Sequence, residues 1–269
     1  MKKIFALILA GLMLFSFAAC GGNTDGNTEP AEGNNAAENS DLAYIKDKGT
    51  LIVGITDYEP MDFKDEKGEW TGFDAEFARL AGEKLDVAVE FIEIDWDNKF
   101  FELDAKSIDC IWNGMTITTE AKENASVSNA YVKNAQVVVM KSADLAAYAT
   151  TESLATLSFA VEAGSAGEEA AKESSLDYTA VLTQADALKE VKSGAADACI
   201  IDITMANAMT GEGTSYENLG YSLELTSEEY GIACRDGSDL TAALNDIMAE
   251  LKADGTLQGL ADKYELTLA

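Results

Sequence analysis

The sequence predicts an α/β protein of two lobes, each a mostly parallel sheet flanked by helices, with two linking strands as the hinge. Short apolar runs alternate with stretches of helical periodicity from Gly49 onward, and the same alternation starts again near residue 157. Strands that alternate with helices form a mainly parallel sheet with helices on both faces. The second start of the pattern therefore indicates a second lobe.

The first lobe begins with a β-α-β-α-β series. LIVGI over 51–55 is a buried-strand run, and residues 73–85 carry apolar side chains at helical spacing. An alternating strand over 87–94 follows, then a helix over 100–107 and a strand over 108–112. Strands joined through helices in this way run parallel.

The second lobe repeats this order. Ser165 is a favourable helix N-cap, and Gly194 is a favourable helix stop. We expect, in order, a strand over 157–164, a helix over 165–174, a strand over 178–182, a helix over 185–194 and a strand over 197–202.

Two strands link the lobes, one near 136–141 and one near 223–229. They divide the chain into lobe 1, over 42–136 with 228–269, and lobe 2, over 140–223. Ligands of such sheets bind at the carboxyl ends of the strands, where the following helices present free N–H groups. If the lobes face each other, four such ends converge on one cleft. These ends are 54–63, 112–118, 162–167 and 202–205.

The N-terminus resembles a secretory signal peptide over residues 1–19. Lys2 and Lys3 precede an apolar run over 4–17 that is too short to span a bilayer, and FAAC, ending at Cys20, resembles a bacterial lipobox. We expect export and lipidation of Cys20. A signal peptide cleaved nearby with a free Cys20, or an uncleaved anchor, is the alternative.

Residues 20–40 are expected to form a flexible tether behind the lipidated cysteine. They are dense in Gly, Asn and Glu and contain no large apolar residue, so ordering them would bury too little surface. Roughly 230 residues remain, which is enough for two modest lobes.

The chain is strongly acidic, with 19 Lys and Arg, 48 Asp and Glu, and a formal net charge of −29. This charge repels nucleic acid and anionic lipid, so neither is an expected partner. There is no histidine and no CxxC motif, so we expect no metal and no cofactor. Cys110, Cys199 and Cys234 lie in apolar runs, which favours three buried thiols over one disulfide and a free thiol.

Seven segments occur in an order typical of one protein family. They are GTLIVGITDYEPMDFKDEKGEWTGFDAEFARLAG, the DW of IDWDNK, IDCIWNGMTIT, VEAGSAGEEA, EVKSGAADACIID, EEYGIACRDGSD and AELKADGTLQGLADKY. Together they resemble extracellular solute-binding protein family 3, the periplasmic amino-acid-binding proteins of bacterial ABC importers, over roughly residues 42–265. The resemblance implies the type II periplasmic-binding-protein fold, whose lobes close by hinge motion over a small polar solute.

The resemblance implies that aromatic side chains enclose the ligand. Tyr58 and Trp96 match the family's aromatic positions, and Asp57 lies where the family has polar contacts. Both aromatics have an alternative interpretation as core or rim residues. Trp112 lies on a strand expected to be buried, so we expect packing at least as much as ligand contact.

Polar groups of both lobes complete the implied site. Gly114, Thr116 and Thr118 match positions whose backbone and hydroxyl groups meet the ligand carboxylate, although the threonines could instead cap the following helix. Asp202 matches the acidic residue that binds the ligand α-amino group, with a helix cap as the alternative. Asn113 at the strand end, and Ser165 and Ala166 at a helix start that would offer N–H groups, complete the set.

One position departs from the family. The pattern T-I-T-x-E-R ends in an Arg that forms a two-pronged pair with the ligand carboxylate, but this chain has Ala121 there. Losing such a pair weakens carboxylate binding by roughly 1.5–3 kcal/mol. Three interpretations stay open: an amino acid held by backbone groups and another cation, an amine selected by Asp202 and by Asp57 or Glu162, or an unrelated ligand.

These features predict a lipid-anchored, monomeric receptor at the cell surface or in the periplasm. It would deliver an amino acid or related amine to an ABC permease and have no catalytic residue. A sensory module that docks to a receptor would share the same features. A dehydratase-like enzyme would need an acid of raised pKa in the cleft, and loss of the Arg disfavours its carboxylate substrates.

Overall fold

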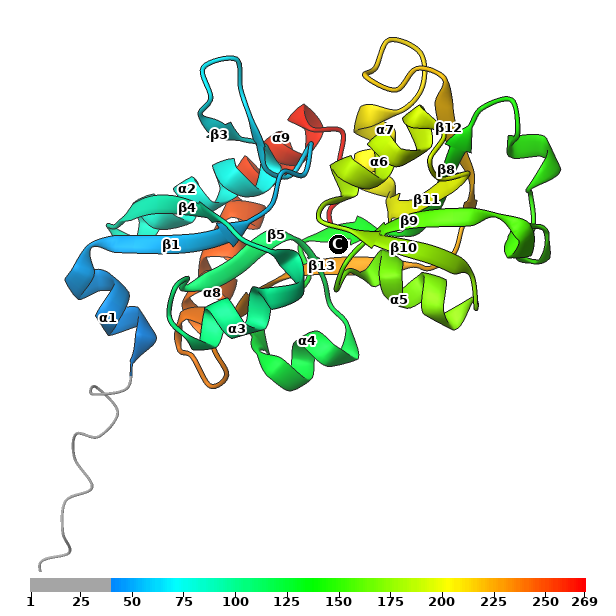
Figure 1. Cartoon of the computed structure of the whole chain (residues 1–269). Helices are drawn as coiled ribbons and strands as arrows, with labels where there is room; N and C mark the ends of the chain where they lie inside the picture. The colour runs from blue at the N-terminus through cyan, green and yellow to red at the C-terminus, as the bar shows by residue number, and fades with distance from the viewer. Residues whose placement is uncertain (1–39) are drawn as a thin grey trace, which may run out of the picture. The chain divides into compact units, whose positions relative to one another are not determined.

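The computed structural model describes residues 40–269, which form two α/β lobes (Figure 1). The predicted two-lobed fold is confirmed, since each lobe has its own sheet with helices packed on it. The predicted signal peptide, Cys20 and all but the last residue of the predicted tether lie outside the described residues.

The sheet of the first lobe joins three parallel strands to an antiparallel return. Its strands are β1 (Thr50–Ile55), β4 (Ala88–Glu93), β5 (Cys110–Thr116), β6 (Ser126–Val127), β7 (Val132–Asn134) and β13 (Glu228–Cys234). β1 pairs in parallel with β4 and β5, and β13 pairs antiparallel with β5, β6 and β7. The order is β4-β1-β5-β13-β6, with β7 on β13.

Helices pack on both faces of this sheet, because alternate residues of its strands point to opposite sides. Leu51, Val53 and Ile55 of β1 belong to the apolar cluster that includes α2, whereas Ile52 joins the cluster that includes α3. The helices are α1 (Asp41–Lys48), α2 (Phe73–Leu85), the 3₁₀ turn η1 (Trp96–Asn98), α3 (Lys99–Asp104), α4 (Thr119–Asn124), α8 (Leu240–Ala253) and α9 (Thr256–Lys263).

The second lobe has the sheet order β10-β9-β11-β8-β12. β9 pairs in parallel with β10 and β11, and β8 pairs antiparallel with β11 and β12. Its strands are β8 (Gln136–Lys141), β9 (Ser158–Glu162), β10 (Asp177–Val181), β11 (Ala198–Asp202) and β12 (Leu219–Glu224). Its helices are η2 (Leu145–Ala147), η3 (Thr151–Thr156), α5 (Ala166–Glu173), α6 (Gln184–Ser193) and α7 (Ile203–Met209).

The chain crosses between the lobes twice, at Ala135 between β7 and β8 and over residues 225–227 between β12 and β13. The backbone N–H of Leu225 donates to the Gln136 carbonyl, and the Gln136 N–H donates to Thr226 Oγ1, both at 2.8 Å. The two crossings are therefore bound side by side. The lobe limits given from the sequence, 42–136 with 228–269 and 140–223, stay a prediction.

Several short elements were not predicted from the sequence, among them a helix before β1, a hairpin before α2 and a helix after β11. α1 begins at the N-cap Ser40, whose side chain accepts from the Ala43 N–H, and ends at Gly49 with φ of +74°. A hairpin of β2 (Phe63–Lys64) and β3 (Trp70–Thr71) precedes α2, and α7 follows β11 directly. All three are short or weakly apolar, so their periodicity is a poor signal.

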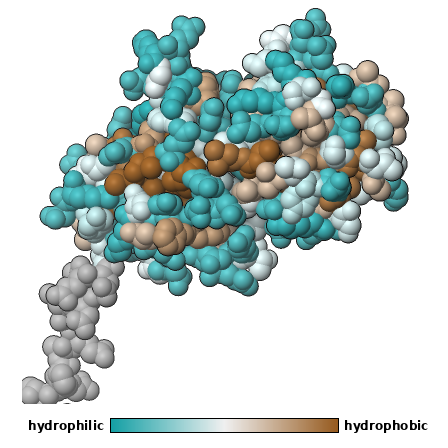
Figure 2. All heavy atoms as spheres, viewed as in Figure 1, coloured by the Kyte–Doolittle hydropathy of each residue, from teal (hydrophilic) through white to brown (hydrophobic). Residues whose placement is uncertain are grey.

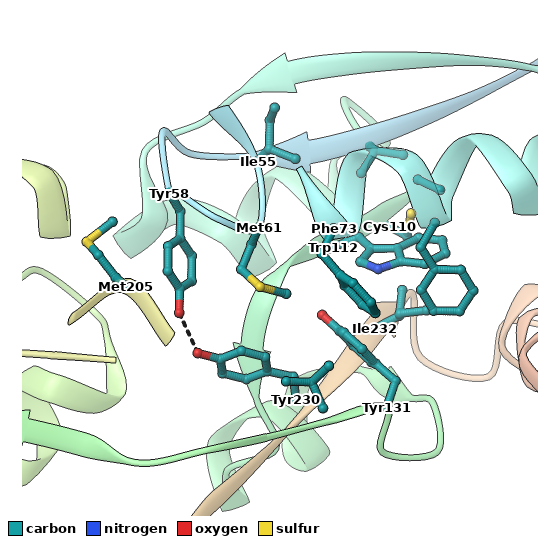
Figure 3. Packing of buried hydrophobic residues seen from close by; sticks show 14 of the residues in the cluster. Ile55, Tyr58, Met61, Phe73, Cys110, Trp112, Tyr131, Met205, Tyr230 and Ile232 are labelled. Carbon is teal, nitrogen blue, oxygen red and sulfur yellow. Dashed lines mark hydrogen bonds between the residues drawn. The ribbon is translucent and has the colours of Figure 1, made fainter. Parts of the chain in front are cut away.

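The core of the first lobe is rich in aromatic side chains (Figure 3). Trp112 is fully buried there and meets the ring of Phe77 edge-on, at 4.7 Å between centroids. Packing is therefore the role that the structure gives Trp112. Cys110, Cys199 and Cys234 are buried and free, which confirms the interpretation as buried thiols.

One face of the molecule is seen to be largely hydrophilic, in keeping with the acidic composition (Figure 2). Figure 2 shows hydrophilic residues over most of the face in view, with apolar residues in a band across its middle. Within residues 40–269, none of the helices has the length and hydropathy needed to span a membrane.

Candidate ligand-binding site

A cavity of about 420 Å³ lies between the two lobes. Its lining includes nine of the ten residues predicted as ligand contacts: Tyr58, Trp96, Asn113, Gly114, Thr116, Thr118, Ser165, Ala166 and Asp202. Asp57 lies outside the cavity lining and is exposed, because its neighbours Thr56 and Tyr58 are turned into the core. The fold thus brings segments from both lobes together where the strand ends were expected to meet.

The lobes touch through polar contacts beside the cavity. The Tyr58 hydroxyl of the first lobe bonds to Thr204 Oγ1 of α7 at 2.5 Å, and also to the Tyr230 hydroxyl (Figure 3). The Lys99 ammonium of α3 donates to the carbonyl oxygen of Gly164, in the loop after β9, at 2.8 Å. The lobes are therefore in contact around the site.

Gly114 has a structural reason to be glycine. Its φ is +55°, and a Cβ there would lie 2.6 Å from Tyr58 Cε1 and 3.2 Å from Tyr230 Cε2. Its backbone N–H, which the family resemblance assigned to the ligand, donates to Asp74 Oδ2 at 2.6 Å. This glycine therefore makes room for two tyrosine rings, and its N–H already has a partner.

The Asn113 side chain is also fully occupied. Its Oδ1 accepts from the N–H and the hydroxyl of Thr56, and its Nδ2 donates to the Thr56 carbonyl and to Asp62 Oδ2. Four hydrogen bonds use the donors and acceptors of an amide. Asn113 thus joins β5 to the turn after β1, and its side chain has no group left for a ligand.

The two threonines that were predicted to contact the ligand carboxylate, Thr116 and Thr118, make different contacts. Thr116 donates its hydroxyl to Glu228 Oε2 at 3.0 Å. Thr118 is the N-cap of α4, and its Oγ1 accepts from the Ala121 N–H at 3.0 Å. The cap predicted as an alternative is therefore present. Because Oγ1 is the acceptor in that bond, the Thr118 hydroxyl hydrogen is still available to a ligand.

On the other side, α5 starts at the cavity. Its N-cap Ser165 accepts from the Glu168 N–H at 3.1 Å and donates its hydroxyl to the Glu162 carbonyl at 2.7 Å. Ala166, the first helical residue, lines the cavity. The first N–H groups of a helix have no partner within the helix, so this end can donate to a carboxylate.

Asp202 is a buried carboxylate held by side-chain amides. Its Oδ1 accepts from Asn134 and, at 2.7 Å, from Gln136, and its Oδ2 accepts from Gln184. Burial and then the charge of Glu228 raise the pKa of Asp202 to about 6, against the lowering effect of the hydrogen bonds from Gln184 and Asn134. Neutral donors orient the carboxylate without neutralising it, so a ligand ammonium can supply the missing charge.

The carboxylate of Glu162 and the amide of Gln184 lie at the same end of the cavity as Asp202. Glu162 is 3% exposed and lines the cavity, and its Oε1 has no hydrogen-bond partner within residues 40–269. Burial and then the charge of Asp202 raise the pKa of Glu162 well above its usual value. Gln184 was missed from the sequence. It accepts from the Asp202 N–H at 2.9 Å, so it fixes both the backbone and the side chain of Asp202.

These features define a protein that binds a small solute between two lobes. The family model for bacterial extracellular solute-binding proteins, family 3, matches residues 51–267. The chain belongs to this family.

Curated relatives and solved structures agree with this. The L-cystine-binding protein TcyJ of Escherichia coli is 30% identical over 228 residues, which are 83% of this chain and 85% of the relative. The arginine-binding extracellular protein ArtP of Bacillus subtilis is 29% identical, over 98% of each chain. A crystal structure of an ArgBP mutant from T. maritima has a TM-score of 0.77 at 33% identity, and the match covers 83% of this chain and 98% of that one.

Proposed function

We propose that this chain is the substrate-binding protein of a bacterial ABC transporter, which delivers an amino acid or a related amine to a membrane permease. The observation that carries this is the cavity between two touching lobes, with the buried carboxylate of Asp202 in its lining. Asp202 would bind the ligand α-amino group, as an ammonium suits a carboxylate already oriented by amides. The relatives named for L-cystine and arginine support this ligand class.

The other cavity residues would surround and orient the ligand. Tyr58 and Trp96 would form its aromatic walls, and the start of α5 at Ser165 and Ala166 would donate to its polar groups. Thr118 would donate its hydroxyl. Aromatic walls with a few well-placed polar groups are typical of small-molecule sites.

We propose binding without catalysis. The one observation that favours an enzyme is Glu162, a buried acid of raised pKa with a free oxygen in the cavity. The relatives named above are binding proteins. Recovery of every bound compound unchanged in mass after incubation would support binding alone, and a product of changed mass would favour the enzyme.

We further propose that the protein is exported and lipidated at Cys20, and acts as a monomer. FAAC after the apolar run supports lipidation. The intact mass of protein extracted from membranes would show the attached lipid. The sensory alternative differs in its gene neighbourhood, since an adjacent permease and ATPase would favour import.

A ligand screen tests the proposed function. Purified protein is screened by native mass spectrometry and thermal shift against the amino acids, L-cystine, polyamines and small peptides. We expect one ligand or a few chemically related ligands to raise the melting temperature. Asp202→Asn should lose this response, because an amide replaces the carboxylate that would bind the ammonium. Absence of any bound compound across the screen would contradict the proposal.

A further inference from the structure

One cation of the cavity is buried without an anion beside it. Lys99 is 6% exposed, and its side chain lines the cavity. Among residues 40–269, none of the ion pairs involves Lys99. Its ammonium donates to the carbonyls of Gly164, at 2.8 Å, and Trp96, at 3.3 Å. Two of its three N–H groups are thus engaged, and the third has no partner in the part of the chain that the structure describes.

Aromatic rings also surround this ammonium. It lies 5.1 Å from the centroid of the Trp96 ring and 5.0 Å from that of Phe100. Rings and carbonyls stabilise a cation partly, but a buried ammonium still costs free energy unless an anion pairs with it. Burial accordingly lowers the pKa of Lys99, despite more distant carboxylates that act in the opposite direction. An anionic group in the cavity would offset this cost.

The other lysine of the cavity lining differs in these respects. Lys172 is an exposed residue, and its ammonium pairs with Glu168 at 3.0 Å. Of the two lysines in the lining, only Lys99 is therefore both buried and without a carboxylate partner. Lys99 is therefore the cation of the cavity lining that is available to pair with the carboxylate of a ligand.

Lys99 also lies close to Ala121, the position at which the family pattern has an arginine. Ala121 of α4 is 2% exposed and lies in the same apolar cluster as Trp96, whose ring lies under the Lys99 ammonium. Glu120, the neighbour of Ala121 in the chain, lines the same cavity as Lys99, and its charge acts to raise the pKa of Lys99. The ammonium from α3 therefore lies near the part of the cavity where α4 lacks its cation.

We propose that Lys99 binds the carboxylate of the ligand, in place of an arginine at position 121. This rests on the proposed function, of whose two ligand classes, amino acids and related amines, it selects the amino acids. Asp202 of the second lobe binds its ammonium and Lys99 of the first lobe its carboxylate. Lysine is a point charge rather than a two-pronged fork, so the site tolerates more than one orientation of the carboxylate.

Pairs of amino acids and their decarboxylated amines test this proposal. The dissociation constants of L-arginine and agmatine, L-lysine and cadaverine, and L-cystine and cystamine are measured by calorimetry on wild type and Lys99→Met. We expect Lys99→Met to weaken amino-acid binding by roughly 10- to 100-fold. Binding of the matching amine should be unchanged or tighter, because the amine has no carboxylate and the variant removes a positive charge.

Two further variants make the result specific. Lys189→Met removes the same charge from an exposed, ion-paired lysine outside the cavity lining and should leave the affinity for both members of each pair within about twofold of wild type. Ala121→Arg on the Lys99→Met background should restore preference for the amino acid. Ala121 is tightly packed, so each variant is first checked by thermal melting, and Lys99→Met alone is sufficient for the test.

The outcomes separate this proposal from the proposed function. Equal loss of amine and amino acid in Lys99→Met would show a structural role and overturn the proposal. Unchanged amino-acid binding would overturn it too, while the proposed function would stand. If wild type binds no member of any pair and the wider screen is also negative, the proposed function fails and this inference fails with it.

Discussion

At the scale of single residues, Gly114 shows how one position serves both packing and the site. Its family assignment was to the ligand carboxylate, yet its N–H donates to Asp74 and its missing side chain makes room for Tyr58 and Tyr230. Gly114 does line the cavity, but its contacts are with protein groups. If Tyr58 contacts the ligand as proposed, we expect Gly114 to affect binding through the placement of the Tyr58 ring.

Gly114→Ala should destabilise the protein by about 1–3 kcal/mol, since a side chain at positive φ is strained and also clashes with Tyr58. Gly213→Ala is the matched control, because Gly213 has φ of +83° with no atom within 4 Å of its Cβ position. Urea unfolding of both variants separates strain from clash. Equal losses of unfolding free energy would contradict a cost from the tyrosine contact.

At the scale of elements, the hydroxyls of Tyr58, Thr204 and Tyr230 connect three segments that are distant in the sequence. They lie in the turn after β1, at the start of α7 and on β13, and each hydroxyl bonds to the other two. The turn after β1 and the strand β13 belong to the first lobe, and α7 belongs to the second. This cluster therefore favours the arrangement in which the lobes touch.

Tyr58→Phe should favour separation of the lobes and weaken ligand binding by roughly two- to tenfold, the effect of one neutral hydrogen bond. The ring is kept, so the packing against Gly114 persists. The radius of gyration from X-ray scattering of the ligand-free protein should increase.

Tyr221→Phe is the control for that variant, since the Tyr221 hydroxyl donates to Asn207 within the second lobe. It should change neither the radius of gyration nor the affinity. A Tyr58→Phe protein with the scattering and affinity of wild type would show that the hydroxyl cluster does not hold the lobes together.

The sequence predicted the strands and their polar ends well, and the residues between them less well. β5, β9 and β11 are buried runs that end in a polar residue, and β1 is followed directly by Thr56, so their pattern is local and easily recognised. Asp57 lies outside the cavity lining because the buried Thr56 and Tyr58 on either side turn it outward. Lys99 was missed because its burial depends on Gly164, 65 residues away, which no local pattern encodes.

At the scale of the whole molecule, several buried carboxyls have no cation partner within residues 40–269. Asp62 and Asp74 are fully buried, and one oxygen of each has no hydrogen-bond partner among the residues that the structure covers. Burial first, and then the charge of Asp74, raise the pKa of Asp62 well above its usual value. Burial also raises the pKa of Asp74, to about 7.

Carboxyls with raised pKa values bind protons more tightly when the protein is folded. Their stabilising effect is therefore complete below the pKa of an unfolded aspartate and is lost as pH rises through the raised values. We expect the ligand-free protein to be more stable at pH 5.5 than at pH 8, by roughly 1–3 kcal/mol. Glu162 and Asp202, whose pKa values are also raised, act in the same direction.

Asp62→Asn should reduce this pH dependence, because an amide has no proton to lose and keeps the hydrogen bond to Asn113. Asp144→Asn removes an equal charge from an exposed turn and should leave the dependence unchanged. Urea unfolding at the two pH values measures both. Equal stability of wild type at pH 5.5 and 8 would contradict the role given to the buried pair.

The position of β13 has a consequence for how the chain is assembled during synthesis. β13 lies between β5 and β6, yet every strand of the second sheet precedes it in the chain. A chain that emerges N-terminus first can therefore finish the second lobe while the first, begun earlier, still has a gap in its sheet. The lobe that starts first is the last to be completed, and its open strand edges must stay protected until residues 228–234 arrive.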